Sequence, residues 1–177
     1  MVLRKEELLN DGETVLQVVM ALQRCSLLVQ AGEVYQATGK IDKALEMYRK
    51  GHAYAKAIEL ARRSFPGQVT DLEESWADYL MASHKSEQAI SHYIEAGKMS
   101  IALRAAIEAK QWEKAADLLD VVGEDNVEPA HFQLLGRYYA GARSYDKAEK
   151  FFIRGRLPVE VVKMHINAGI ASYTKHQ

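Results

Sequence analysis

Apolar residues along most of the chain recur at spacings of three and four, which is the period of an amphipathic α-helix and not of a β-strand. From Val15 to Val29 this spacing forms one stripe, and it predicts a long helix from about Glu13 to Thr38. A second helix is expected to begin near Asp42, after Gly39 interrupts the pattern. Further helices are expected at about residues 52–64, 69–83, 86–96, 100–109, 112–122, 129–142, 145–154 and 158–168.

The segments between these helices are short, and the prolines mark their edges. Pro66, Pro129 and Pro158 each lie near a point where the apolar pattern restarts, as expected for residues that end or begin helices. Short connections make successive helices antiparallel neighbours. We therefore expect an all-α fold of about ten antiparallel helices arranged as helical hairpins, forming one α-solenoid segment over residues 1–177.

One frame of small and aromatic residues occurs twice with the same offsets, over about residues 25–58 and 129–162. Both copies resemble tetratricopeptide repeats (TPRs), in which small residues allow two helices to approach closely. A third copy near residues 77–96 is weaker, and the array is irregular. The residues assigned to packing within and between repeats are Leu28, Gly32, Tyr35, Ala44, Tyr48, Trp76, Ala77, Ala89, Tyr93, Ala96, Ala115, Leu119, Phe132, Gly136, Tyr139, Ala148 and Phe152.

Composition narrows the class of function. The net charge of −1 and the pI near 6.6 argue against a nucleic-acid binder. The only cysteine, Cys25, excludes an internal disulfide and lies on the apolar stripe, so we expect a small core residue in a reducing compartment. No stretch is apolar enough to be an integral membrane span. Because no metal-ligand spacing or phosphate-binding loop occurs, we expect no cofactor, no metal site and no enzymatic activity.

Two charged patches are candidates for a partner surface. Asp71, Glu74 and Asp78 can line one helix face, where a solvated face is the simpler interpretation and a docking site for a basic partner the sharper one. A basic stretch later in the chain has the same two interpretations, with an acidic partner or a membrane surface as the sharper one. Its candidate residues are Arg143, Lys147, Lys150 and Arg154.

Four sequence blocks resemble subunits of the intraflagellar transport B complex: ARRSFP (61–66), LEESWADYL (72–80), HYIEA (92–96) and QWEKA (111–115). The resemblance implies a fragment of a longer subunit that acts as a protein–protein interaction scaffold in ciliary transport trains. It also implies a role in cilium assembly and maintenance. The implied partners are other train subunits, and the implied location is the cilium or flagellum and the basal body, on the cytoplasmic side.

Two alternatives stay open beside the transport scaffold. One is a general TPR adaptor, and the other is a vesicle-coat type α-solenoid that binds peptide partners. A homodimer through exposed solenoid ends is a further expectation, because an uncapped end leaves an apolar face. Val161, Val162 and Ile166 are the candidates for such a contact.

Overall fold

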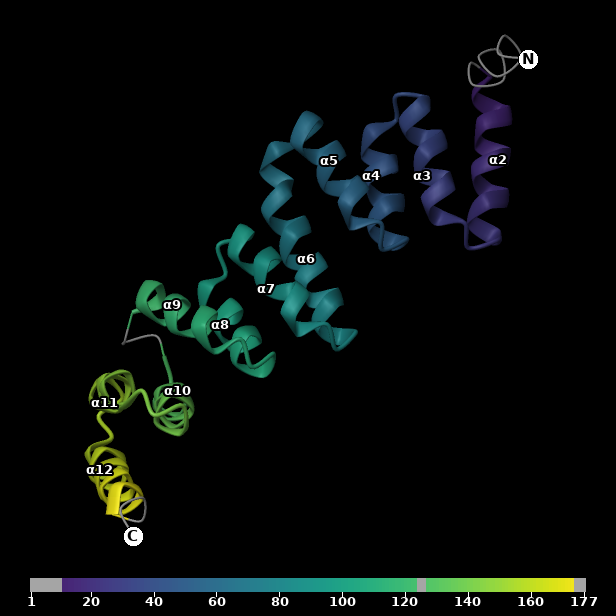
Figure 1. Ribbon diagram of the computed structural model, residues 1–177. Helices are drawn as coiled ribbons and strands as arrows, with labels where there is room; N and C mark the ends of the chain where they lie inside the picture. Colours follow the sequence, from purple (N-terminus) through teal and green to yellow (C-terminus); the bar gives the residue numbers. More distant parts are fainter. Residues whose placement is uncertain (1–10, 124–126, 174–177) are drawn as a thin grey trace. The chain divides into compact units, whose positions relative to one another are not determined.

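The computed structural model describes residues 11–123 and 127–173, with side chains up to residue 169 (Figure 1). Within these residues the chain is all-α, as predicted, and has no β-strand. None of the described helices is both long and apolar enough to cross a bilayer. The helices are α2 (Gly12–Arg24), α3 (Leu28–Ala37), α4 (Ile41–Lys50), α5 (Tyr54–Ser64), the 3-10 helix η1 (Pro66–Gln68), α6 (Val69–Ala82), α7 (Ser86–Glu95), α8 (Met99–Glu108), α9 (Trp112–Val122), α10 (Pro129–Gly141), α11 (Tyr145–Arg154) and α12 (Pro158–Tyr173).

The predicted helix boundaries agree closely with the structure except at two places. The long helix predicted over 13–38 is wrong, because the chain breaks into α2 and α3 at Ser26, whose φ is 59°. The N–H of Leu27 donates to the carbonyl of Leu22 at 2.8 Å and closes α2 at this point. An apolar stripe can continue across such a tight turn, so periodicity alone does not reveal the break. Helix α12 also continues to Tyr173, beyond the predicted end at residue 168.

The same type of turn ends most of the helices. A residue with a left-handed φ follows the helix, and the next N–H donates to the carbonyl five residues back, which is the Schellman arrangement. These N–H groups belong to Leu27, Lys40, Ala53, Lys98, Gln111, Ser144 and Leu157. Left-handed residues recur at intervals of 13 along the sequence, at positions 26, 39 and 52, then 84, 97 and 110, then 143 and 156. Helices of about ten residues alternating with three-residue turns produce this interval.

Residue contacts divide the chain into two compact units. The first comprises residues 1–80 and 95–97. In it α2, α3, α4 and α5 pack each against the next, and η1 packs against α5 (Figure 1). The apolar core of this unit is formed by Val15, Val19, Ala31, Tyr35, Ala44, Leu45, Met47, Tyr48, Ala57, Ile58, Leu60, Ala61 and Leu72.

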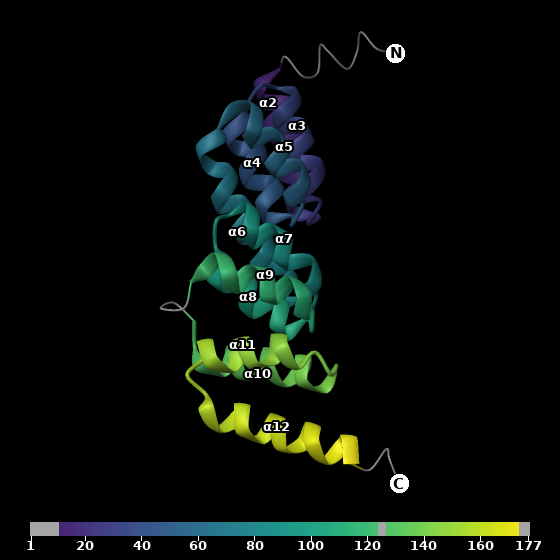
Figure 2. The same cartoon turned by 60° about the vertical axis from the view of Figure 1, so that its left-hand side comes forward.

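The second unit comprises residues 81–94 and 98–177. Helix α8 packs against α9, α9 against α10, α10 against α11, and α11 against α12. Figure 2 shows α10 and α11 lying side by side, with α12 following α11. The largest side chains that are almost completely buried here are Ile90, Leu103, Leu119, Leu135 and Phe152.

A glycine packed against an aromatic ring joins the two helices of the best-defined hairpins. A Cβ atom on Gly32 of α3 would come within 2.6 Å of Cε1 of Tyr48 on α4, which is closer than real Cβ contacts allow. In the second unit, a Cβ atom on Gly136 of α10 would overlap the ring of Phe152 on α11 in the same way. The ring therefore occupies the space that any larger residue would need, and the two helices approach closely.

The expectation that Cys25 lies in the core is wrong. Cys25 is exposed and is the C-cap residue of α2, where its N–H donates to the carbonyl of Ala21 at 3.1 Å. Helix α2 ends at Arg24 and the chain turns at Ser26, so the side chain of Cys25 does not reach the core.

The left-handed turns generate a prediction about two glycines. Gly39 has a φ of 73°, and a Cβ atom there would meet nothing within 4 Å, so Gly39→Ala adds backbone strain without a clash. We expect a loss of about 1 kcal/mol in the free energy of unfolding. Gly141, at the end of α10, is the matched control: it also has open space, and Gly141→Ala should stabilise by roughly 0.5 kcal/mol. Urea denaturation measures both changes, and a destabilising Gly141→Ala or a neutral Gly39→Ala would contradict this account.

The glycine–ring contact generates a second prediction. Gly136→Ala should cost about 1–3 kcal/mol, because the new methyl group overlaps the ring of Phe152. The same substitution made together with Phe152→Leu should cost much less than it does alone, because the smaller side chain can yield. A double-mutant cycle in urea denaturation measures this coupling. Purely additive effects of the two substitutions would show that the contact does not hold the hairpin together.

Candidate protein interaction surfaces

The residues assigned to repeat packing from the sequence lie inside the fold. Leu28, Trp76 and Ala96 are half-buried, and the other members of the set are buried. These side chains determine how helices pack and leave the polar helix faces as the surfaces open to other molecules. Candidate interaction surfaces are therefore to be found on those faces.

Helix α6 carries the three predicted acidic residues and, next to one of them in sequence, a buried acidic residue that the sequence did not single out. Asp71 and Asp78 are exposed and Glu74 is half-buried, whereas the neighbouring Glu73 is only 4% exposed. A carboxylate oxygen of Glu73 lies 3.5 Å from the guanidinium of Arg62 on α5. A buried carboxylate needs such a cation, so one acidic side chain of this helix links α5 to α6 within the chain.

Four aromatic rings connect the turn between α4 and α5 with helix α6. His52 stacks on Tyr79 with ring centroids 4.4 Å apart, and Tyr54 stacks on Trp76 at 6.2 Å. Tyr54 and Tyr79 are 5.7 Å apart and join the two pairs. Trp76 is therefore a packing residue of the first unit. Helical periodicity placed Trp76 on a face but could not identify partners more than twenty residues away.

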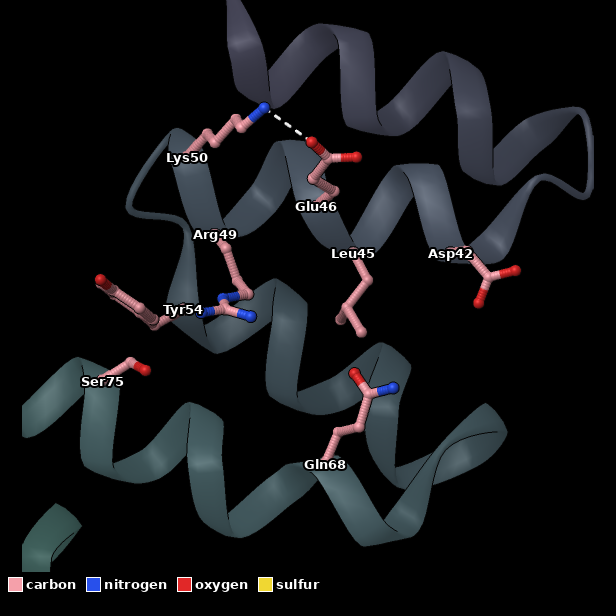
Figure 3. A pocket seen from close by; sticks show the side chains of 8 residues that line it. All are labelled: Asp42, Leu45, Glu46, Arg49, Lys50, Tyr54, Gln68 and Ser75. Atoms are coloured by element: carbon pink, nitrogen blue, oxygen red, sulfur yellow. Dashed lines mark hydrogen bonds and ion pairs between the residues drawn. The ribbon is translucent and has the colours of Figure 1, made fainter.

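A hollow of about 540 Å³ lies between α4 and α6, with Tyr54 of α5 and Gln68 of η1 among its lining residues (Figure 3). The guanidinium of Arg49 points toward Tyr54, whereas Lys50 turns to Glu46, with its Nζ 2.6 Å from the carboxylate. Burial raises the pKa of the Tyr54 hydroxyl, and Arg49 opposes this change. Polar groups of both charge signs line this hollow, which suits contact with a polar surface better than with an apolar ligand.

The basic stretch of α11 faces acidic residues of α9 across a second hollow, of about 420 Å³. Asp120 of α9 and Arg154 of α11 form an ion pair of 2.5 Å. The remaining charged residues that line the hollow are Glu113 and Asp117 on α9 and Lys147 and Lys150 on α11. Arg143 is not among these lining residues, because it occupies the left-handed position of the turn between α10 and α11.

Two aromatic rings, those of Tyr139 and Phe151, also line this hollow. The charges around the hollow affect the pKa of Tyr139. Tyr139 of α10 stacks on Phe151 of α11 with centroids 5.4 Å apart, and the Nζ of Lys147 lies 5.3 Å from the Tyr139 ring centroid. Burial raises the pKa of the Tyr139 hydroxyl, and the negative charges of Glu113 and Asp117 raise it further. The acids of α9 and a base of α11 are therefore both near the same ring.

No arrangement for metal-assisted chemistry is visible in residues 11–123 and 127–173, where no group of three His, Cys, Asp or Glu side chains could hold an ion. The surfaces described above consist of charged and aromatic side chains on helix faces. They can form ion pairs and stacking contacts with another macromolecule. The geometry supports binding.

Tight α-hairpins in which a glycine packs against an aromatic ring define a helical-repeat protein of the TPR type. Residues 8–175 match the family described as the TPR domain of the intraflagellar transport proteins 140 and 172, and the chain belongs to this family. It is 38% identical to the intraflagellar transport protein 172 homolog of Danio rerio over 165 residues, 93% of this chain and 9% of that protein. It is also 38% identical to the human homolog over 96% of this chain and 10% of that protein.

The chain is similar to an algal protein to nearly the same degree. The intraflagellar transport protein 172 of Chlamydomonas reinhardtii is 36% identical over 152 residues, 86% of this chain and 9% of the algal protein. The chain thus spans about a tenth of the length of these curated relatives.

Arg137 of α10 and Glu160 of α12 form an ion pair of 3.3 Å, and this contact generates a prediction about pH. Hydrogen bonds from Arg137 and then from Lys163 lower the pKa of the Glu160 carboxyl. A carboxyl with a lowered folded-state pKa stabilises the fold above its unfolded pKa, and this stabilisation is lost as the pH falls through the folded value. Arg137→Gln should raise the pKa of Glu160 toward its ordinary value, and Lys163→Gln should do so less. NMR titration of the side-chain carboxyl measures both, and an unchanged pKa in both variants would refute the assignment.

Proposed function

We propose that this chain is a segment of an intraflagellar transport subunit and that it acts there as a protein–protein interaction scaffold. The observation that carries the proposal is the family match, which extends through the whole described array of helices. Relatives at 36–38% identity over 86–96% of the chain bear the name of the same transport protein. The chain's role is then a part of cilium assembly and maintenance, and it is a structural role with no enzymatic step.

The exposed surface supports a binding role. Beside the charged and aromatic surfaces, α2 and α12 each carry three exposed large apolar side chains: Leu16, Val18 and Met20 on α2, and Val159, Val162 and Ile166 on α12. Val162 and Ile166 are 57% and 55% exposed and lie four residues apart on α12, so they project from one helix face. Exposed apolar side chains on one face are typical of protein contact surfaces. The partners we infer are other subunits of the transport train, in the cilium or flagellum and at the basal body, on the cytoplasmic side.

Size-exclusion chromatography with light scattering tests the proposal on the chain mixed in turn with purified intraflagellar transport subunits. We expect the chain to form a complex of defined stoichiometry with at least one train subunit. An unrelated TPR protein of similar size, mixed with the same subunits, should form none.

A variant with two surface substitutions separates this result from self-association. Val162→Glu combined with Ile166→Glu changes only exposed positions of α12, so circular dichroism should remain that of the original chain. A dimer of the chain alone that disappears in this variant, with no complex formed with any train subunit, would contradict the scaffold proposal and assign the α12 face to a homodimer.

A further inference from the structure

The hollow between α9 and α11, called the groove from here on, has one acidic wall and one basic wall. An ion pair joins the two walls. Glu113, Asp117 and Asp120 follow one another on α9 at spacings of four and three, and so lie on one helix face. Lys147, Lys150 and Arg154 do the same on α11. The ion pair of Asp120 with Arg154 connects the residues nearest the carboxyl ends of these helices.

The other four charges of this groove are available to a ligand. Glu113, Asp117, Lys147 and Lys150 are all exposed, and none of them forms an ion pair with another residue in the described part of the chain. Lys147 contacts the ring of Tyr139 through a cation–π interaction, and the side of its ammonium group that faces away from the ring can bind an anion. Two carboxylates thus face two ammonium groups across a hollow of about 420 Å³, which is within the size range of ligand sites.

The spacing of these charges is compatible with an extended polypeptide, more closely on α9 than on α11. A rise of 1.5 Å per residue separates Glu113 from Asp117 by about 6 Å along α9, and Lys147 from Lys150 by about 4.5 Å along α11. In an extended chain, side chains on the same side recur every second residue, about 6.6 Å apart, and consecutive side chains point to opposite sides. A segment that alternates basic and acidic residues would therefore present cations to α9 at nearly the interval of its carboxylates. It would present anions to α11 at an interval about 2 Å longer than that of the lysines, a difference that the flexible lysine side chains can span.

We propose that the groove between α9 and α11 binds a short extended segment of another transport subunit in which acidic and basic residues alternate. This proposal rests on the proposed function for the source of the segment and on charge complementarity for its chemistry. A purely acidic segment would meet the carboxylates of α9, and a purely basic one the ammonium groups of α11. Each of these segments would be repelled by the wall that carries the same charge.

The first TPR copy lacks this arrangement, which indicates that packing of the repeat does not require it. Lys43 lies over the ring of Tyr35 in the first copy just as Lys147 lies over Tyr139 in the second. The residue that corresponds to Lys150 is Glu46, and Glu46 pairs with Lys50 on its own helix. Lys43 is therefore a matched control for Lys147, since it has the same cation–π contact.

Fluorescence anisotropy with labelled, end-capped hexapeptides tests the proposal on the full chain. The peptides are alternating Glu-Lys, the block sequence Glu-Glu-Glu-Lys-Lys-Lys, all-Glu and all-Lys. We expect the alternating peptide to bind at least tenfold more tightly than the block peptide of identical composition. Added salt should weaken this binding, because the contacts are ionic and exposed.

Charge reversal of one wall at a time completes the test. Lys147→Glu with Lys150→Glu should weaken binding of the alternating peptide at least tenfold and favour the all-Lys peptide. Glu113→Lys with Asp117→Lys should have the same effect on the alternating peptide and favour the all-Glu peptide. Lys43→Glu should leave binding unchanged, and circular dichroism should show that all variants are folded.

Several results would overturn the proposal. These are equal binding of alternating and block peptides, no binding of either, or binding lost equally in Lys43→Glu. Self-association of the chain that either wall reversal abolishes, without peptide binding, would assign the groove to a second copy instead. None of these peptide measurements uses a transport subunit. A negative peptide result therefore rejects the groove proposal only, and the scaffold role is decided separately by the chromatography experiment.

Discussion

The turn that closes most of the helices is the constraint on which the rest of this structure depends. One residue adopts a left-handed φ, and the next N–H returns to the carbonyl five residues back. In five of these turns the accepting carbonyl belongs to an aromatic residue: Tyr35, Tyr48, Tyr93, Tyr139 or Phe152. The same five side chains are buried in the fold. One residue therefore ends a helix through its backbone and fills the core through its ring, so helix length and helix packing are determined together.

This coupling explains why the surfaces lie where they do. The apolar faces are used for packing, so each helix of about ten residues leaves a short polar face. Only α10 lies between α9 and α11 in the order of helices along the chain. Two segments depart from the 13-residue interval. The 3-10 helix η1 lies between α5 and α6, and residues 123–128 separate α9 from α10. Gln68 of η1 lines the hollow of the first unit, so one such departure contributes to a candidate surface.

Most of the fold could be predicted from the sequence, because helical periodicity and the TPR frame both depend on spacing. The frame correctly placed Gly32 and Tyr48 on two helices that pack together, because the ring of Tyr48 fills the space that the glycine leaves. The break at Ser26 could not be predicted, because a left-handed serine has no distinct sequence signal and the apolar stripe continues across it. The acidic wall of the groove was missed for another reason. Asp120 and Arg154 are 34 residues apart, and pairing at such a distance follows from tertiary structure alone.

Amide hydrogen exchange by NMR tests the central role of the turns most directly. We expect the N–H groups of Leu27, Lys40, Ala53, Gln111 and Ser144 to exchange as slowly as those within the adjoining helices, although all five residues lie outside helices. Exchange of these five N–H groups at the rate of an unstructured peptide, while the helices remain protected, would contradict this expectation. The helices would then be held by side-chain packing without the backbone closure described here.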